Sequence, residues 1–264
     1  IDNINGILNF TNEKGLHSEL IKGSLWGESF EAKIFQDNNI QKILLDTSVK
    51  PSSLGGLVDF PWADVVSGII PLKGTLTLKP LKNKLDKNIS LNQKSALTLM
   101  LKSDLLGNEI RLPEPFNKKK NEKRDLALKF HFDSKLTRIE STVGDDFVTD
   151  LRFDSEGFTR GLASFDTTTA MPSGNELLIA ASLSEVDVKD WAPWLKQFSD
   201  PALLEEKSWT PILDLNFKSF KFSNVEFKDF ESRTIFGDDA IEIKFSSHLG
   251  DGVLLMPQLA DDFP

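Results

Sequence analysis

Residues able to carry out acid–base, nucleophilic or metal chemistry are few in this sequence. It contains three histidines, His17, His131 and His248, and no cysteine. The His-Glu-x-x-His, Gly-x-Ser-x-Gly, phosphate-loop and dinucleotide-binding patterns are all missing, so zinc hydrolysis, serine catalysis and nucleotide chemistry lack their residues. His131 alternates with two phenylalanines and is expected on the polar face of a strand. The sequence therefore predicts no catalytic residue, no metal site and no cofactor.

Adjacent carboxylates are the other candidates for catalysis, because a glycosidase works with two of them. Such pairs occur at Asp145-Asp146, Asp238-Asp239 and Asp261-Asp262. Neighbouring residues of a strand point to opposite faces, so adjacent acids do not converge on one substrate. We interpret them as turn and surface residues. A carbohydrate-active enzyme stays open as a less favoured alternative.

Charge excludes one class of partner and leaves one basic segment to explain. The net charge is -9 over 264 residues, which disfavours nucleic acid because phosphate binding needs a basic stripe. Positive charge gathers in a segment, residues 113–124, that begins Pro-Glu-Pro; the basic residues are Lys118, Lys119, Lys120, Lys123 and Arg124. Proline lacks a donor for a central strand and like charges repel, so this segment is predicted to be an exposed, solvated loop. Contact with anionic lipid headgroups is the alternative.

The elements around these residues are predicted to be strands with one apolar face. In residues 126–132, leucine and phenylalanine alternate with Ala127, Lys129 and His131, which is the period of a half-buried strand. The same period recurs along the chain at Leu97, Leu99 and Leu101; at Phe147, Thr149, Leu151 and Phe153; at Leu213, Leu215 and Phe217; after a phase slip at Phe220 and Phe222; and at Ile241, Ile243 and Phe245. The chain has 20 phenylalanines and no tyrosine, so its aromatic rings carry no hydroxyl that needs a partner. A closed β-sandwich core and a ligand-lining face use the same alternation, and both stay open at this point.

Helical periodicity is confined to short segments. Residues 51–68 fit one or two helical turns that end at Gly68, and residues 189–198 place Trp191, Trp194, Leu195 and Phe198 at spacings of three and four. Such an apolar stripe more often plugs the end of a sheet than lies in a membrane interface. Asp200-Pro201 predicts a further helix start for residues to about 206. We treat residues 1–264 as one segment with a possible sub-boundary near 199–210.

Two stretches resemble the YhdP family, large AsmA-like envelope proteins of two-membraned bacteria. Residues 101–119, LKSDLLGNEIRLPEPFNKK, are similar to its SdL-x-G-x-x-x-x-LP-x-P-x-x-K segment at Ser103, Asp104, Leu105, Gly107, Leu112, Pro113, Pro115 and Lys118. Residues 177–195, LLIAASLSEVDVKDWAPWL, resemble a family strand followed by D-x-x-x-W-x-x-W-L. The opening, Asn5-Gly6 to Gly27, and the closure, Gly252 to Pro257, are also similar. The resemblance covers nearly the whole chain as part of a much longer protein, and none of its motifs is catalytic.

The resemblance implies an all-β fold, in which a long antiparallel sheet is curled into an elongated apolar groove with one or two short helices. It further implies a non-enzymatic, periplasmic conduit that carries phospholipid acyl chains between the inner and outer membranes. The chain opens with Ile1 and shows no signal peptide or membrane-spanning run, so we interpret it as a processed chain or an excised fragment. The resemblance implies an internal fragment of a parent protein that is anchored to the inner membrane. The lipid-lining candidates are Leu126, Leu128, Phe130, Phe132, Leu213, Leu215 and Phe217. A closed β-sandwich that serves as a structural or assembly module of an envelope protein is the main alternative.

Overall fold

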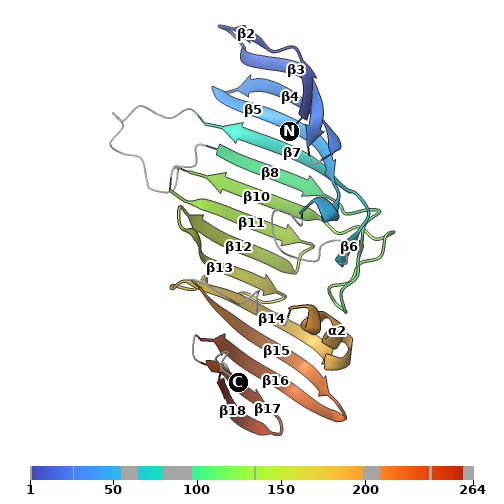
Figure 1. Cartoon of the computed structure of the whole chain (residues 1–264), viewed down its shortest axis with the longest axis vertical. Helices are drawn as coiled ribbons and strands as arrows, with labels where there is room; N and C mark the ends of the chain where they lie inside the picture. Colours follow the sequence, from blue (N-terminus) through green and yellow to red (C-terminus); the bar gives the residue numbers. More distant parts are fainter. Residues whose placement is uncertain are drawn as a thin grey trace, which may run out of the picture. The chain divides into compact units, whose positions relative to one another are not determined.

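β-Strands make up most of the described chain, as the alternating pattern predicted (Figure 1). The computed structural model describes residues 2–25, 27–54, 65–79, 97–133, 135–198, 209–237 and 240–257. The chain divides into two units, Ile1–Gly144 (unit 1) and Asp145–Pro264 (unit 2). The predicted sub-boundary near 199–210 lies within unit 2, and most of it falls outside the described residues.

Unit 1 is built on an antiparallel sheet with a small two-stranded sheet beside it. The order in the main sheet is β1 (Asp2–Gly6), β3 (Gly15–Leu25), β4 (Glu28–Asp37), β5 (Ile40–Val49), β7 (Ile70–Leu78), β8 (Leu97–Ser103), β10 (Leu126–Phe132) and β11 (Thr137–Val143), with β2 (Asn9–Thr11) paired to β3. The small sheet pairs β6 (Val66–Ser67) with β9 (Glu109–Ile110). Asn38 and Asn39 join β4 to β5 with φ angles of 49° and 60°, a left-handed pair that suits a two-residue hairpin.

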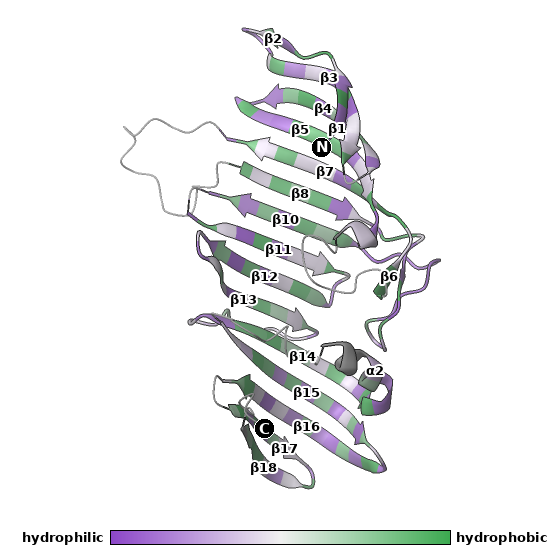
Figure 2. Cartoon of the chain, in the orientation of Figure 1, coloured by the Kyte–Doolittle hydropathy of each residue, from purple (hydrophilic) through white to green (hydrophobic). Residues whose placement is uncertain are grey.

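The register of unit 1 places the alternating residues as predicted. Phe130 lies opposite Leu99 on one side and Ile139 on the other, whereas His131 lies opposite Thr98 and Arg138. Directly paired residues share a face of the sheet. Hydrophobic and hydrophilic residues therefore alternate from Leu128 to Phe132, and Figure 2 shows bands of both kinds on the strands of unit 1.

Unit 2 contains a mixed sheet instead of the purely antiparallel one expected. Its order is β12 (Phe147–Asp154), β13 (Gly157–Phe165), β14 (Glu176–Asp187), β15 (Thr210–Phe222), β16 (Val225–Phe236), β17 (Ala240–Ser247) and β18 (Gly250–Pro257). β14 pairs in parallel with both β13 and β15. Parallel strands need a long return connection, and helix α2 (Val188–Phe198) lies in the connection from β14 to β15. β14 is also buried on both faces, at Leu178 and Ala180 on one and at Leu183 on the other, as is typical of strands with parallel neighbours.

In unit 2, the alternation of side chains between the two faces is interrupted at matching positions of three neighbouring strands. Side chains three residues apart share a face in β14 (Leu183 and Val186), in β15 (Phe217 and Phe220) and in β16 (Phe227 and Phe230). Pairing skips Ser184, Lys218 and Asp229, yet the strands stay in register on both sides of the step. The predicted phase slip in β15 is therefore confirmed, and it is shared by both neighbours.

The helices agree in part with the sequence-based expectation. The helix predicted at 189–198 is α2, and Pro51–Leu54 form a short 3-10 helix, η1. Val66, predicted to be helical, instead belongs to strand β6, because its main chain pairs with Ile110 of β9. The helix predicted from Asp200 to about 206 lies outside the described residues.

Candidate functional site: the apolar face of unit 1 and its strap

Every charged residue of β5, β7, β8, β10 and β11 lies on one face of the sheet in unit 1. The register places Lys42, Asp46, Lys73, Lys102, Lys129, Arg138 and Glu140 on this polar face. The opposite face of the same strands, the apolar face, carries mainly leucine, isoleucine, valine and phenylalanine. The apolar face of these five strands therefore carries no charged residue.

One part of the apolar face is partly exposed although it lies over central strands. We call it the open half, and it consists of Ile43, Leu76, Leu97, Leu99, Phe130, Phe132 and Ile139. None of these side chains reaches full burial, and Phe130 and Phe132 stack with ring centroids 6.2 Å apart. A closed sandwich would cover such positions with a second layer.

The other end of the apolar face is covered by the chain itself. Val49, Ile70 and Leu72 form a buried cluster with Leu105, and Leu101, Leu126 and Val143 pack against it from the ends of their strands. Leu105 belongs to the connection from β8 to β10, residues 104–125, which we call the strap (Figure 1). Ile110 of the strap and Val66 of β6 contact the same cluster. The strap thus forms a lid over this end of the face.

Lys118 is the buried centre of the strap. The residue is only 2% exposed, and its ammonium donates hydrogen bonds to the carbonyl oxygens of Leu105 (2.7 Å), Asn108 (2.8 Å) and Lys119 (3.1 Å). Burial lowers the pKa of Lys118, and the positive charge of Arg124 adds to this effect. The prediction of a solvated loop tip was therefore wrong for Lys118, since three main-chain carbonyls replace the water that an exposed ammonium would bind.

Further main-chain contacts fix the strap internally. Gly107 N–H donates to Lys120 O (2.8 Å), Ile110 and Lys118 exchange two hydrogen bonds (2.9 and 3.0 Å), and Arg124 Nη2 donates to Asn117 O (2.9 Å). Asn108 is fully buried, with its Nδ2 atom donating to Ser67 O (3.3 Å). The strap is therefore an ordered part of unit 1, although Lys119, Lys120 and Lys123 are exposed, as predicted for this segment.

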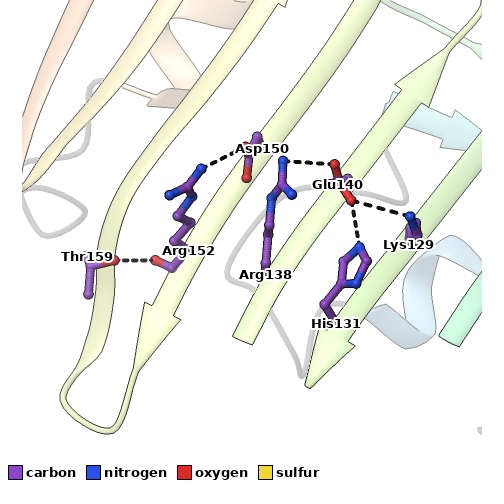
Figure 3. Close-up of polar contacts among 7 residues, drawn as sticks. All are labelled: Lys129, His131, Arg138, Glu140, Asp150, Arg152 and Thr159. Atoms are coloured by element: carbon purple, nitrogen blue, oxygen red, sulfur yellow. Dashed lines mark hydrogen bonds and ion pairs between the residues drawn. The ribbon is translucent and has the colours of Figure 1, made fainter. Parts of the chain in front are cut away.

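The polar face carries a cross-strand charge network around Glu140 (Figure 3). The Glu140 carboxylate lies 2.7 Å from His131 Nε2, 2.9 Å from Arg138 Nη2 and 3.9 Å from Lys129 Nζ. His131 thus lies on the polar face, as predicted. All four side chains are partly exposed, and such ion pairs contribute little to stability.

Glu140→Gln is therefore expected to lower the free energy of unfolding by no more than about 1 kcal/mol. Solvent screens the charges of Lys129 and Arg138, which lose their carboxylate partner, and added salt should reduce the effect further. Urea denaturation at low and high salt measures both. A loss well above this, insensitive to salt, would contradict the view that this face is only a solvated surface.

Unit 2 places its predicted residues on one face and adds a cluster of rings. Leu213 and Leu215 are half-buried, whereas Phe217 is buried (5% exposed). The ring cluster consists of Phe217, Phe220, Phe227, Phe230 and Phe245, with the shortest centroid distance, 4.7 Å, between Phe220 and Phe230. Phe217, predicted as a lining residue, therefore lies in a packed cluster of rings.

Within each unit, the predicted lining residues share one face of the sheet. Leu126, Leu128, Phe130 and Phe132 follow one another along the apolar face of β10, and Leu126 packs beneath the strap. Sequence reasoning missed the strap as a covering element. The eight resemblance positions from Ser103 to Lys118 were a usable signal, because most of them belong to the strap.

Of the acid pairs considered as catalytic candidates, one lies in the described residues. Asp145 and Asp146 lie in a turn next to β12, as predicted, and the other two acid pairs fall outside the described residues. No group of three or more His, Cys, Asp or Glu that could hold a metal occurs in the part of the chain that the structure describes. In the same residues, no helix has the length and apolarity to cross a membrane.

These features define an all-β protein whose sheet in unit 1 separates a polar face from an apolar, partly open one. The chain belongs to the YhdP protein family, because the family model described as YhdP protein matches residues 1–261. No curated protein and no solved structure matches it.

Proposed function

We propose that the chain is a non-enzymatic lipid-transport segment in which the apolar face of unit 1 holds phospholipid acyl chains. The observation that carries the proposal is the open half, where leucine, isoleucine and phenylalanine stay partly exposed in the middle of a sheet without any charged neighbour on the same face. An exposed apolar surface of this kind marks a site for an apolar partner. Membership of the YhdP family supports the same proposal.

The chemistry of this face suits passage better than tight binding. Hydrocarbon burial contributes about 25 cal/mol per Å² and has no preferred direction. Leucine and phenylalanine offer no hydrogen-bond partner that would fix a chain at one position. Burial of its hydrocarbon surface can therefore hold an acyl chain while the chain moves across successive strands. Its charged headgroup is expected to stay in water.

The location and partners follow from the same proposal. The segment would act in the periplasm as part of a parent protein anchored to the inner membrane, with phospholipid as its ligand and both membranes reached through the rest of that protein. The alternative is a closed β-sandwich that serves as a structural or assembly module of an envelope protein. In unit 1 it is less favoured, because the open half lacks the full burial that a second layer would produce.

Phe130→Glu is expected to reduce bound phospholipid at least about tenfold, because the carboxylate places a charge in the acyl path. The protein is purified without detergent from a two-membraned bacterium, and native mass spectrometry with lipid extraction measures the bound lipid. Thr98→Glu is the matched control: it adds the same charge on the polar face, opposite His131, and should leave the lipid in place.

Circular dichroism of both variants separates binding from folding. A folded Phe130→Glu protein that keeps its lipid would contradict the proposal. An unfolded one would place Phe130 in a closed core and favour the sandwich. Wild-type protein that carries no phospholipid and takes up no fluorescent lipid would also reject the transport function.

A further inference from the structure

The strap covers only part of the apolar face, and the boundary runs across the strands. Along β10, Leu126 packs against the buried cluster beneath the strap, while Phe132, at the other end of the strand, lies in the open half. Six residues of extended chain separate these positions by about 20 Å. Both side chains are half-buried and share one face, but of the two only Leu126 packs against the cluster that the strap covers.

The strap is built to stay in place. A buried ammonium without a carboxylate among its three acceptors carries a large desolvation cost, which a freely moving surface loop would avoid by exposing the lysine. The carbonyls of Leu105 and Asn108 come from the beginning of the strap, ten or more residues before Lys118. The ammonium thus links the second half of the strap to its beginning, at Leu105 of the buried cluster.

We propose that the strap is a side wall of the lipid path in unit 1. It excludes acyl chains from the end of the apolar face where Val49 and Leu72 lie, and it confines them to the open half. Lys118 is the positioning residue that holds this wall. The inference rests on the proposed function and adds which part of the face the ligand occupies. It also gives the resemblance motif from Ser103 to Lys118 a physical role, since its last residue closes the strap.

The absence of native cysteine allows a direct test with single-cysteine variants. Phe132→Cys and Leu126→Cys are each exposed to a phosphatidylethanolamine that carries a maleimide at the end of one acyl chain. Intact-mass spectrometry measures the adduct. With the strap unaltered, Phe132→Cys should react at least about fivefold more than Leu126→Cys.

Opening the strap should remove this difference. Lys118→Met in the Leu126→Cys protein is expected to raise the adduct at least about fivefold. Lys120→Met, at an exposed lysine of the same segment, should leave the adduct unchanged. Where Lys118→Met fails to fold, the contrast between the two cysteine positions with an intact strap still decides the question.

Three outcomes overturn the inference. Equal labelling of both cysteines with the strap intact shows that the strap does not exclude lipid. Hydrogen exchange first shows whether Lys118→Met has opened the strap. If it has, and the labelling of Leu126→Cys is still unchanged, another part of the protein excludes the lipid. Bound phospholipid without adduct at either cysteine rejects this path while leaving the transport function intact, whereas protein without any phospholipid rejects that function itself.

Discussion

Phe217→Ala is expected to lower the stability of unit 2 by about 3–5 kcal/mol. The ring is 5% exposed and stacks against Phe220 and Phe230 at centroid distances of 5.5 and 6.1 Å. Removing the ring loses the free energy that is gained when the ring leaves water for the core. It also leaves a cavity that rigid neighbours fill only in part. Urea denaturation, followed by hydrogen exchange of the amides of β15 and β16, measures the loss and places it in unit 2.

Phe222→Ala is the matched control, because the same residue type at the end of the same strand is 57% exposed. It should cost less than about 1 kcal/mol. Similar losses for both variants would contradict the assignment of Phe217 to a packed core. Phe217 would then be a better candidate for lipid contact than for stability.

Lys118→Met is expected to open the strap, with a local destabilisation of about 3 kcal/mol. Methionine fills much of the lysine volume but removes the ammonium from all three carbonyls. Leu105 O and Lys119 O then keep only the N–H groups of Asn108 (3.1 Å) and Glu122 (3.2 Å), and Asn108 O loses its donor. The amides of Gly107 and Ile110, both hydrogen-bonded inside the strap, should lose roughly 100-fold in hydrogen-exchange protection.

Lys120→Met provides the comparison for this experiment. Lys120 is exposed and contributes its main-chain carbonyl to Gly107, which the substitution keeps. Protection in the strap should therefore stay at the wild-type level. Equal protection in both variants would mean that apolar packing of Leu105 and Ile110, and not the Lys118 ammonium, holds the strap.

The two-residue period was sufficient to predict most of the sheet. It placed Phe130 and His131 on opposite faces, because alternation along a strand depends only on neighbouring residues. The tryptophan spacing likewise predicted the helix that is observed as α2, for the same local reason. The curling of the sheet into a groove concerns long-range shape and stays a prediction.

Features that depend on distant residues were not predictable in this way. The burial of Lys118 requires carbonyls from Leu105 and Asn108, which come near only once the strap has folded back, and a run of lysines otherwise indicates solvent. The parallel pairing of β14 depends on its return connections, which carry no periodic signal. The alternation predicted an apolar face that includes Phe130 and Phe132. The strap, which covers one end of this face, was recognised only in the structure.

The residues skipped by the pairing in unit 2 make the lengths of three strands depend on one another. Deleting only Lys218 from β15 would leave this strand one residue shorter than β14 and β16 and shift its pairing with both of them beyond the deletion. Deleting Ser184, Lys218 and Asp229 together would keep the strands in step. Insertions and deletions at this level are therefore expected to be inherited as a set of three, so that a relative shortened in one of these strands is shortened in its two neighbours as well.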